Sequence, residues 1–254
     1  MKPPLTPMAR LRYDRIRALL PLGPRSLLEI GCGEGAVGYR LAQQYSYVGV
    51  EPDEQSCAVA RARVGARGDV RCADIATLTG ERFDIVCAFE VLEHIEDDES
   101  ALRAWCGLLD PGGHLLISVP AYADRFGAAD EAVGHFRRYE PAAVAKLLES
   151  VGLTDVRMLM YGAPLGYALE SVRNRLLATR SSDASRADRT AASGRLLQPR
   201  NPVVATMTAV AVAPFALVQR ALPHHGVGIV ARGQLPPQTA AGATPIRGAD
   251  PRRR

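Results

Sequence analysis

The residue types best suited to ligand chemistry form a glycine-rich turn, GCGEG, at residues 31–35. An apolar stretch at 26–30 precedes the turn, and residues 36–44 are expected to form a helix directly after it. Glycine permits backbone angles and a close ligand approach that other residues hinder, and the first N–H groups of a helix lack internal partners. The segment therefore predicts a strand, a ligand-binding turn and a helix. The predicted ligand contacts in the turn are Gly31, Cys32, Gly33 and Gly35.

A carboxylate stands where such a ligand would place a ribose. Glu51 follows a second predicted strand at 47–50 and lies 20 residues after Gly31. At the end of that strand it can accept hydrogen bonds from both ribose hydroxyls, with Pro52 beside it. By spacing alone, Gly31-x-Gly33-x-x-Ala36 also fits a dinucleotide site, so the glycines do not decide between cofactors.

Three further features favour S-adenosylmethionine over a dinucleotide. Glu29, two residues before Gly31, suits a cofactor with a cationic amino group and a sulfonium, and suits a pyrophosphate poorly. Asp74 ends a third predicted strand, where it can accept a hydrogen bond from an adenine amino group. The third is a pair of segments: a fourth strand at 83–89 leads into EVLEHI, and DPGG precedes a fifth strand at 114–119. The D/H/C spacing of a metal site is absent, and we expect no metal.

Together these segments resemble class I S-adenosylmethionine-dependent methyltransferases. The shared features are E-x-G-x-G-x-G, the acidic end of the second strand, the Asp after the third, V-L-E-H-I and L-x-P-G-G. The similarity covers roughly residues 24–160 and is greatest to the small-molecule branch of the ubiquinone-biosynthesis type. It implies that the turn holds the methionine part, that Glu51 holds the ribose, and that Asp74 with Ile75 holds the adenine. It also implies that three residues close over the methyl donor: Glu90, Val91 and Leu92.

The acceptor is expected beyond the fifth strand, because ligands bind beyond the carboxyl ends of strands in such sheets. There the segment GHFRRY at 134–139 offers His135 as a general base. Arg137 and Arg138 can hold an anionic group, and Tyr122 and Tyr139 can line the pocket. The alternative is that residues 137–139 begin the next helix and pair with surface carboxylates. His94 is interpreted either as a weaker candidate for the base or as a capping or packing residue.

Strands that alternate with helices predict right-handed βαβ units. We expect an α/β fold, a Rossmann-like doubly wound sheet of seven strands, mostly parallel with an antiparallel last strand. Amphipathic helices are predicted at 8–20 and 141–150, further helices at 55–64 and 100–109, and strands at 70–72, 154–160 and 226–231. The predicted domain spans residues 1–233.

An insertion at about 163–222 interrupts this domain before its last strand. It begins with a predicted helix at 165–178, continues as a basic, flexible part at about 179–201, and ends in an uncharged stretch at 203–218. That stretch is shorter than the roughly 20 apolar residues of a spanning helix. It either packs on the sheet edge or a partner subunit, which we favour, or forms a membrane-facing lid. Residues 234–254 are expected to be a disordered tail.

Composition limits the function classes. Residues 1–179 carry a net charge of −4 and residues 180–254 a net charge of +8, and aromatic residues make up only 6%, which argues against a nucleic-acid partner. The five cysteines form no C-x-x-C pair and several lie in apolar runs, so we expect reduced, buried thiols in a cytoplasmic protein, with membrane association as the alternative.

The predicted function is methyl transfer by in-line displacement, without metal, to a small-molecule, lipid-linked or glycan-type acceptor. Two other classes stay open: a non-catalytic binding module on the same fold, and a nicotinamide-dependent oxidoreductase. The second would need a further catalytic constellation such as Tyr-x-x-x-Lys, which the sequence lacks.

Overall fold

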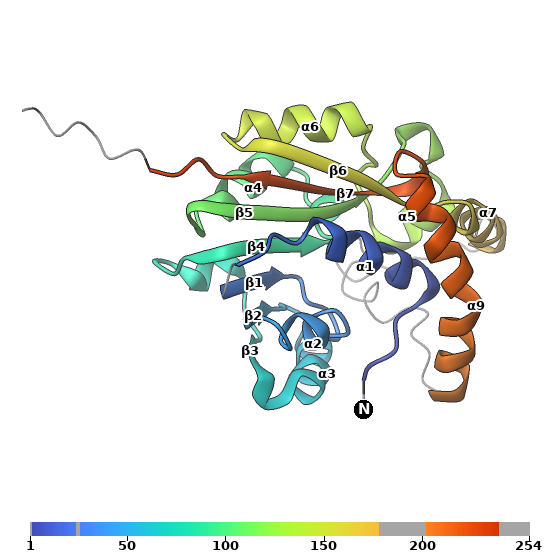
Figure 1. Ribbon diagram of the computed structural model, residues 1–254, viewed down its shortest axis with the longest axis horizontal. Coiled ribbons are helices and arrows are strands. Elements are labelled where there is room, and N and C mark those ends of the chain that lie inside the picture. Colours follow the sequence, from blue (N-terminus) through green and yellow to red (C-terminus); the bar gives the residue numbers. More distant parts are fainter. Residues whose placement is uncertain (1, 24–25, 178–201, 239–254) are drawn as a thin grey trace, which may run out of the picture.

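The computed structural model describes residues 2–23, 26–177 and 202–238 (Figure 1). Within them, one sheet has the strand order β3-β2-β1-β4-β5-β7-β6. The strands are β1 (Ser26–Ile30), β2 (Ser46–Val50), β3 (Gly68–Arg71), β4 (Phe83–Phe89), β5 (Leu109–Pro120), β6 (Thr154–Gly162) and β7 (Gly226–Gln234). The α-helices are α1 (Pro7–Leu19), α2 (Gly38–Leu41), α3 (Glu54–Val64), α4 (Asp98–Cys106), α5 (Ala128–Val133), α6 (Pro141–Ser150), α7 (Leu165–Leu177) and α9 (Pro202–Ala221).

The strand directions confirm the predicted fold class. Strands β3, β2, β1, β4 and β5 pair in parallel, whereas β7 lies antiparallel between β5 and β6. The strand order reverses between β1 and β4, which pair directly. In open α/β sheets such a switch point, at the carboxyl ends of the strands, is where ligands bind. The topology therefore places a ligand crevice beyond Ile30 and Phe89.

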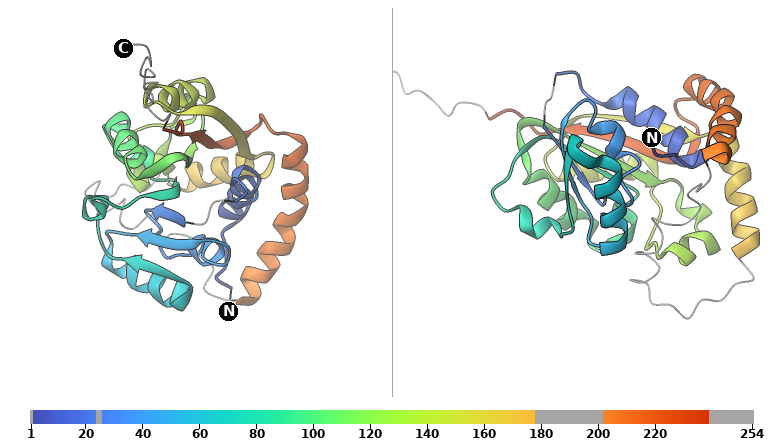
Figure 2. Two further views of the ribbon diagram at one scale, coloured as in Figure 1. Left: turned by 60° about the vertical axis from the view of Figure 1, so that its left-hand side comes forward. Right: turned by 90° about the horizontal axis from the view of Figure 1, so that it is seen from below.

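The sheet is covered on both faces, and β4 shows why its sequence is continuously apolar. Val86 and Ala88 pack in a cluster with residues of α4 and α6, while Ile85 and Cys87 pack in a second cluster with residues of α1, α2 and α3. Successive side chains of a strand point to opposite faces, so a strand buried on both sides has no polar face. The helices accordingly form two layers around the sheet (Figure 2).

The two described helices of the insertion lie at the end of the sheet that carries β6 and β7. Gln219 fastens α9 there: its Nε2 donates to the Leu11 carbonyl at 3.0 Å, and its Oε1 accepts from the Gly162 N–H at 3.1 Å. Because Gln219 is fully buried, these bonds join α9 to α1 and β6. Within residues 203–218, Val212 is buried as well, and the choice between packing and membrane contact stays a prediction.

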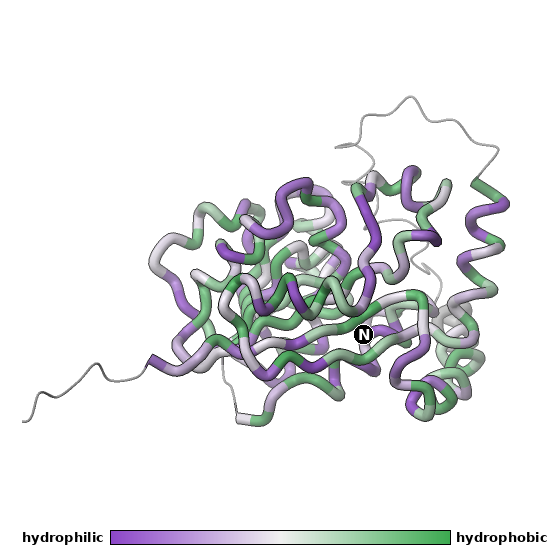
Figure 3. The backbone as a smooth tube through the Cα atoms, turned by 90° about the horizontal axis from the view of Figure 1, so that it is seen from above, coloured by the Kyte–Doolittle hydropathy of each residue, from purple (hydrophilic) through white to green (hydrophobic). Residues whose placement is uncertain are grey.

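The other side of α9 faces solvent. Met207, Val210 and Leu217 are each more than 60% exposed, and Figure 3 draws α9 mostly in hydrophobic green. No helix among the described residues is long and apolar enough to cross a membrane. The basic part at 179–201 and the tail from 239 onward lie outside the described residues, whereas β7 extends through Gln234, one residue into the predicted tail.

Some local predictions need correction. Cys57 and Cys72 form a disulfide, contrary to the expectation of five reduced thiols, because α3 and the end of β3 bring their Cα atoms to 5.5 Å. Cys32, Cys87 and Cys106 are free and buried, as expected. The helix predicted at 100–109 ends at Cys106, and DPGG belongs to β5 rather than to a turn before it. The helix expected at 36–44 is confined to Gly38–Leu41.

Candidate functional site

The glycine turn after β1 adopts a backbone that requires glycine. Gly31, Gly33 and Gly35 have φ angles of +65°, +53° and +72°, in the left-handed region that other residues rarely adopt. A Cβ atom on Gly31 would lie 2.7 Å from Val91 Cγ2, and one on Gly35 would lie 2.9 Å from the Ala60 Cα. A Cβ atom on Gly33 would meet nothing within 4 Å. The turn therefore packs against the rest of the protein at Gly31 and Gly35 and has open space at Gly33.

Glu51 joins this turn to the end of β2. Its Oε2 accepts a hydrogen bond from the Gly33 N–H at 2.9 Å, and its Oε1 accepts one from the Asp53 N–H at 3.0 Å. Burial raises the pKa of Glu51, and these two bonds oppose the rise. Asp74 lies farther along the same rim, where its Oδ1 accepts from the Ala76 N–H at 2.9 Å. Each carboxylate keeps lone pairs for a ligand while it orders its own loop.

Glu29 lies behind the turn and is 3% exposed. Its Oε2 accepts a hydrogen bond from the Tyr47 hydroxyl at 2.7 Å. Burial raises the pKa of Glu29 to about 8, although Tyr47 and Arg12 favour its charged form. A cationic group bound at this turn would further favour the carboxylate, because opposite charges attract strongly where water is excluded.

A cavity of about 1780 Å³ begins at these residues and runs past the ends of β4 and β5 to α7. Glu29, Gly33, Glu51 and Asp74 line one part of it, and residues of α1, α5 and α7 line the other. Typical sites for one small ligand measure roughly 300–1,000 Å³. The cavity is therefore large enough for a cofactor and a second molecule.

Glu90, the first residue after β4, has a φ of +58°, which is uncommon for a residue with a side chain and marks local strain. Its Oε1 accepts hydrogen bonds from Ser118 Oγ at 2.9 Å and from the Tyr161 hydroxyl at 3.0 Å. Its Oε2 lies 3.4 Å from Nη1 of Arg12 on α1. Contacts from β5, β6 and α1 thus hold Glu90 in this conformation at the cavity wall.

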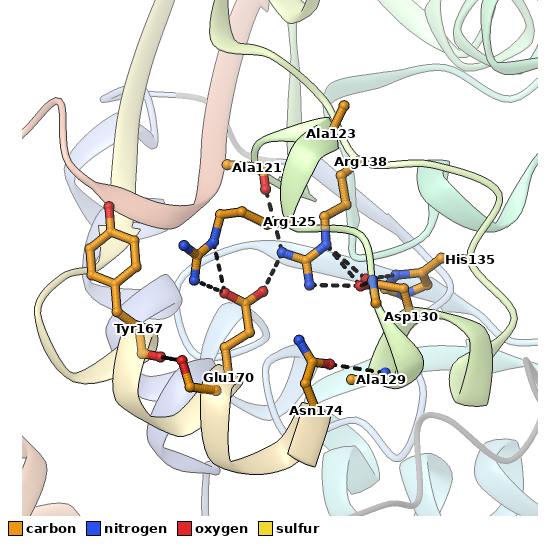
Figure 4. A network of polar contacts seen from close by, with 12 residues as sticks. Ala121, Ala123, Arg125, Ala129, Asp130, His135, Arg138, Tyr167, Glu170 and Asn174 are labelled. Atoms are coloured by element: carbon orange, nitrogen blue, oxygen red, sulfur yellow. Dashed lines mark hydrogen bonds and ion pairs between the residues drawn. The ribbon is translucent and has the colours of Figure 1, made fainter. Parts of the chain in front are cut away.

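His135 is oriented by a chain of buried charges (Figure 4). Its Nδ1 lies 2.8 Å from Oδ1 of Asp130, which is fully buried. Arg138 donates from Nε to both oxygens of Asp130, at 3.0 and 2.9 Å, and also pairs with Glu170 on α7. Burial alone would raise the pKa of Asp130, but the bonds from His135 and Arg138 lower it to about 2. Asp130 is thus an ionised acceptor, which fixes a proton on Nδ1 of His135.

Glu93 and His94 complete this side of the cavity. The His94 and His135 rings meet edge to face, with their centroids 4.7 Å apart. Burial, together with the nearby His135, lowers the pKa of His94 to about 4, so that its ring is neutral at pH 7. Burial, together with the nearby Glu90, raises the pKa of Glu93 well above its ordinary value. Oε1 of Glu93 lies 3.7 Å from Nε2 of His135.

Comparison with known proteins identifies the family. Residues 8–158 match the protein family described as a methyltransferase domain. The chain belongs to this family. It is 33% identical over 171 residues to a ubiquinone biosynthesis O-methyltransferase of Methylobacterium nodulans, covering 59% of this chain and 68% of that protein. It is 28% identical over 167 residues to the protein of the same name in Idiomarina loihiensis, covering 57% and 69%.

A solved structure agrees with this assignment. The N-methyltransferase NodS from Bradyrhizobium japonicum, in complex with S-adenosyl-L-homocysteine, is similar with a TM-score of 0.53 and 25% identity. The match covers 63% of this chain and 83% of that one. The protein is an S-adenosylmethionine-dependent methyltransferase, and its cofactor is S-adenosylmethionine. The oxidoreductase and the non-catalytic module, which the glycine spacing and the fold left open, are thereby set aside.

The structure brings most of the methyltransferase's predicted site residues to one cavity. The residues predicted for the cofactor that line it are Glu29, Gly31, Cys32, Gly33, Glu51, Pro52, Asp74, Ile75, Glu90 and Val91. From the acceptor side, His94, His135 and Arg138 line it as well. These residues come from the ends of β1, β2, β3 and β4 and from the loop around α5, which is where a doubly wound sheet collects ligand contacts.

Five predicted residues lie outside this lining: Gly35, Leu92, Tyr122, Arg137 and Tyr139. Leu92 packs in the core at 1% exposure, and Arg137 and Tyr139 both bond to Oδ2 of Asp98, at 3.0 and 3.1 Å. For Arg137 and Tyr139 these bonds fit the alternative of pairing with a carboxylate, although α6 begins only at Pro141; the ligand contacts of all three residues stay predictions. The Tyr122 hydroxyl likewise points to Met160, with a distance of 3.5 Å to Sδ. Arg138 lines the cavity, but its guanidinium pairs with the carboxylates of Asp130 and Glu170.

Other residues of the methyltransferase were not expected at the site. Asp130, Glu170 and Arg12 reach it from α5, α7 and α1, none of which adjoins the glycine turn in sequence. Nothing in the spacing of these residues indicates their role. For Glu93 the sequence does contain an indication of a role. It is an acidic residue within the apolar V-L-E-H-I segment, and a buried charge in such a segment needs a partner.

Proposed function

We propose that this methyltransferase transfers the methyl group of S-adenosylmethionine to a hydroxyl oxygen of a small, largely apolar acceptor. The observation that carries the proposal is one cavity with two unlike parts. The glycine turn and Glu51 line one part, and His135 stands in the other beside an apolar wall. Among the small-molecule, lipid-linked and glycan-type acceptors expected from the sequence, this wall favours the apolar ones.

The apolar wall comes from two segments that line the cavity. Leu5 lies just before α1 and Met8 in its first turn, and Leu169, Val172 and Leu176 lie along α7. The last three side chains are 37%, 53% and 66% exposed, so they present apolar surface that an acceptor would remove from water. Burial of apolar surface contributes about 25 cal/mol per Å². A sugar would leave this wall uncovered.

The chemistry requires alignment and the loss of one proton. In the displacement, a lone pair of the acceptor oxygen attacks the methyl carbon while the carbon–sulfur bond breaks, and the electron pair passes to sulfur. Holding the two molecules in line supplies most of the rate enhancement. The hydroxyl proton must leave, and His135, oriented by Asp130, is the group that we propose to promote its departure.

The relatives named as ubiquinone biosynthesis O-methyltransferases support oxygen as the methylated atom. The test is a transfer assay with methyl-labelled cofactor and four matched acceptors: an alkyl-substituted phenol, the same phenol without the alkyl chain, the corresponding aniline, and a monosaccharide. We expect transfer to the alkyl phenol and a higher KM for the short phenol. Preferred methylation of the aniline or the sugar would contradict the proposal.

Membrane contact through residues 203–218 stays a prediction. The exposed apolar side of α9 supports it, and the side fastened by Gln219 supports packing instead. Sedimentation with anionic liposomes at low and physiological salt separates the two. A protein that stays in the supernatant under both conditions has no membrane contact there.

A further inference from the structure

Arg173 is a cation of the cavity wall without a counterpart. It lies on α7 and lines the cavity, and its Nε is buried with no hydrogen-bond partner among the described residues. The ion pairs formed by those residues likewise leave its guanidinium without a carboxylate. A buried N–H of a charged group costs free energy as long as it bonds to nothing. A ligand with hydrogen-bond acceptors would therefore be stabilised beside Arg173.

The other arginines of the cavity wall are engaged with carboxylates of the protein. Among the described residues they are Arg12 and Arg138. Nη1 of Arg12 lies 3.4 Å from Oε2 of Glu90, and Arg138 is shared between two buried carboxylates. No lysine of the described part of the chain lines the cavity. Arg173 is therefore the basic side chain of this wall that a ligand can meet without displacing an ion pair.

The contacts of α7 direct this helix toward the acceptor part of the cavity. Glu170 pairs with two arginines, and Oδ1 of Asn174 accepts from the Ala129 N–H at 3.0 Å (Figure 4). These contacts fix the rotation of the helix about its axis. Positions that recur three and four residues apart, as on one helix face, then line the cavity: Gly166, Leu169, Glu170, Arg173, Leu176 and Leu177.

This face of α7 is apolar apart from its two charged residues. Leu169 and Leu176 stand about one turn before and after Arg173, and both are exposed, whereas the charge of Glu170 is already compensated. A molecule against this face would meet apolar side chains and one guanidinium. The planar fork of a guanidinium matches the oxygens of a carboxylate or a phosphate, and the attraction strengthens where apolar groups exclude water.

We propose that the methyl acceptor carries an oxyanion, a carboxylate or a phosphate, which Arg173 binds while the apolar part of the acceptor lies along α7. This inference rests on the proposed function for the hydroxyl that takes the methyl group, and it adds the charge of the acceptor. An acceptor with one oxyanion next to an apolar group supplies what this face of α7 lacks: a partner for the guanidinium and a cover for the leucines.

The oxyanion and the reacting hydroxyl belong to different points of one acceptor. Glu170 is linked through Arg138 and Asp130 to His135, the proposed base. Arg173 follows Glu170 by three residues, which is about 4.5 Å along the helix at 1.5 Å per residue. The hydroxyl at His135 and the oxyanion at Arg173 are thus held at opposite ends of this chain of ion pairs.

Binding of the oxyanion leaves the methyl transfer step unchanged. The hydroxyl oxygen forms the bond to the methyl carbon, the carbon–sulfur bond breaks with its electron pair passing to sulfur, and the hydroxyl proton leaves toward His135. The oxyanion stays out of the reaction because the guanidinium engages its lone pairs. Arg173 is therefore a specificity-determining residue, and its loss should raise KM more than it lowers kcat.

The first test measures binding without turnover, by titration calorimetry in the presence of S-adenosylhomocysteine. The probes are an alkyl benzoate without a hydroxyl group, the corresponding alkylphenyl phosphate, and the methyl ester of the benzoate. Arg173→Met removes the charge, and Arg173→Lys keeps the charge but removes the fork. Arg175→Met is the matched control, because Arg175 is exposed on the same helix and is not part of the cavity lining. Titration with S-adenosylmethionine shows that each variant is folded.

We expect wild type and Arg175→Met to bind the benzoate or the phosphate about 10- to 100-fold more tightly than the ester, as for hydrogen bonds to a charged group. The anion that binds more tightly identifies the oxyanion of the acceptor. Arg173→Met should lose this preference, and Arg173→Lys should keep part of it. Equal affinity of the wild type for the anions and the ester overturns the proposal, as does a preference that persists in Arg173→Met.

The second test is methyl transfer to the hydroxyl-bearing counterpart of the tighter anion and to its neutral ester. We expect a lower KM for the anion in wild type, and in Arg173→Met a KM raised to that of the ester with kcat nearly unchanged. Binding of the anions through Arg173 without methylation of any hydroxyl would contradict the proposed function alone. Methylation of the alkyl phenol without any preference for an anion would contradict this inference alone.

Discussion

The carboxylate of Glu51 accepts a hydrogen bond from the Gly33 N–H across 2.9 Å, and so ties the end of β2 to the glycine turn after β1. The same residue lines the cofactor part of the cavity. Through this bond one side chain both shapes the turn and lines the cavity. Replacement of Glu51 should therefore lower the affinity for the cofactor more than replacement of an exposed carboxylate does.

We expect Glu51→Ala to weaken S-adenosylmethionine binding by about 10- to 100-fold. The variant loses acceptors for ligand hydroxyls, and an unpaired buried polar group costs about 1–3 kcal/mol, where 1.4 kcal/mol is a factor of ten in affinity. Titration calorimetry measures the effect. Asp69→Ala is the control, because Asp69 is an exposed carboxylate of β3 that pairs with Arg71 at the surface. Wild-type affinity in Glu51→Ala would remove Glu51 from the cofactor site.

We expect His135→Ala to lower kcat by about 10²- to 10⁴-fold, the usual contribution of a group that moves a proton. Cofactor affinity should stay nearly intact, since His135 stands on the acceptor side of the cavity. Steady-state kinetics and calorimetry measure the two quantities, and His225→Ala, at an exposed site, is the control. If cofactor affinity falls instead and turnover at saturation does not change, His135 belongs to the cofactor site.

The pKa of Glu29, raised to about 8 by burial, makes cofactor affinity depend on pH. Below pH 8 the free protein holds a proton on Glu29, and a cationic cofactor favours its loss. Affinity should therefore rise as pH increases from 6 toward 8 and then level off. Because the cofactor's own amino group also titrates near pH 8, the measured quantity is the ratio of wild-type to Glu29→Gln affinity. A ratio that is constant from pH 6 to 9 would falsify this role of Glu29.

The buried ion pairs of Arg138 should also stabilise the folded protein. Arg138→Met leaves Asp130 and Glu170 without their shared buried cation, and breaking a buried pair costs about 3–5 kcal/mol. Urea unfolding measures the loss. Arg157→Met is the matched control, since Arg157 is 62% exposed and pairs with Asp155 at the surface, where a pair contributes about 0–1 kcal/mol. Equal losses in the free energy of unfolding would show that the buried ion pairs of Arg138 stabilise the protein no more than a surface pair does.

Local pattern was enough to predict the cofactor part of the site. The turn at 31–35, Glu51 and Asp74 each stand at the end of a strand, and neighbouring parallel strands end at one edge of a sheet. Strand periodicity and turn chemistry act over a few residues, so the sequence displays them directly. The seven-stranded sheet followed from the same alternation of elements.

The acceptor part depended on contacts between distant segments. Tyr139 and Arg137 looked suited to a substrate, yet both bond to Asp98, while Asp130 and Glu170 emerged as the partners of Arg138. Such pairings join residues up to 41 positions apart, and no local pattern indicates which charge meets which. The disulfide between Cys57 and Cys72 was missed for the same reason.

By itself, the sequence determined the class of fold and the edge of the sheet at which the cofactor binds, because those depend on periodicity, glycine geometry and strand ends. The identity of the cofactor followed from the resemblance to a known family. Only the tertiary structure decided which polar groups are paired inside the protein and which face the cavity. That outcome rests on the desolvation of charges when segments pack together: Arg138 is neutralised by two carboxylates, while Glu93 is left beside two histidines.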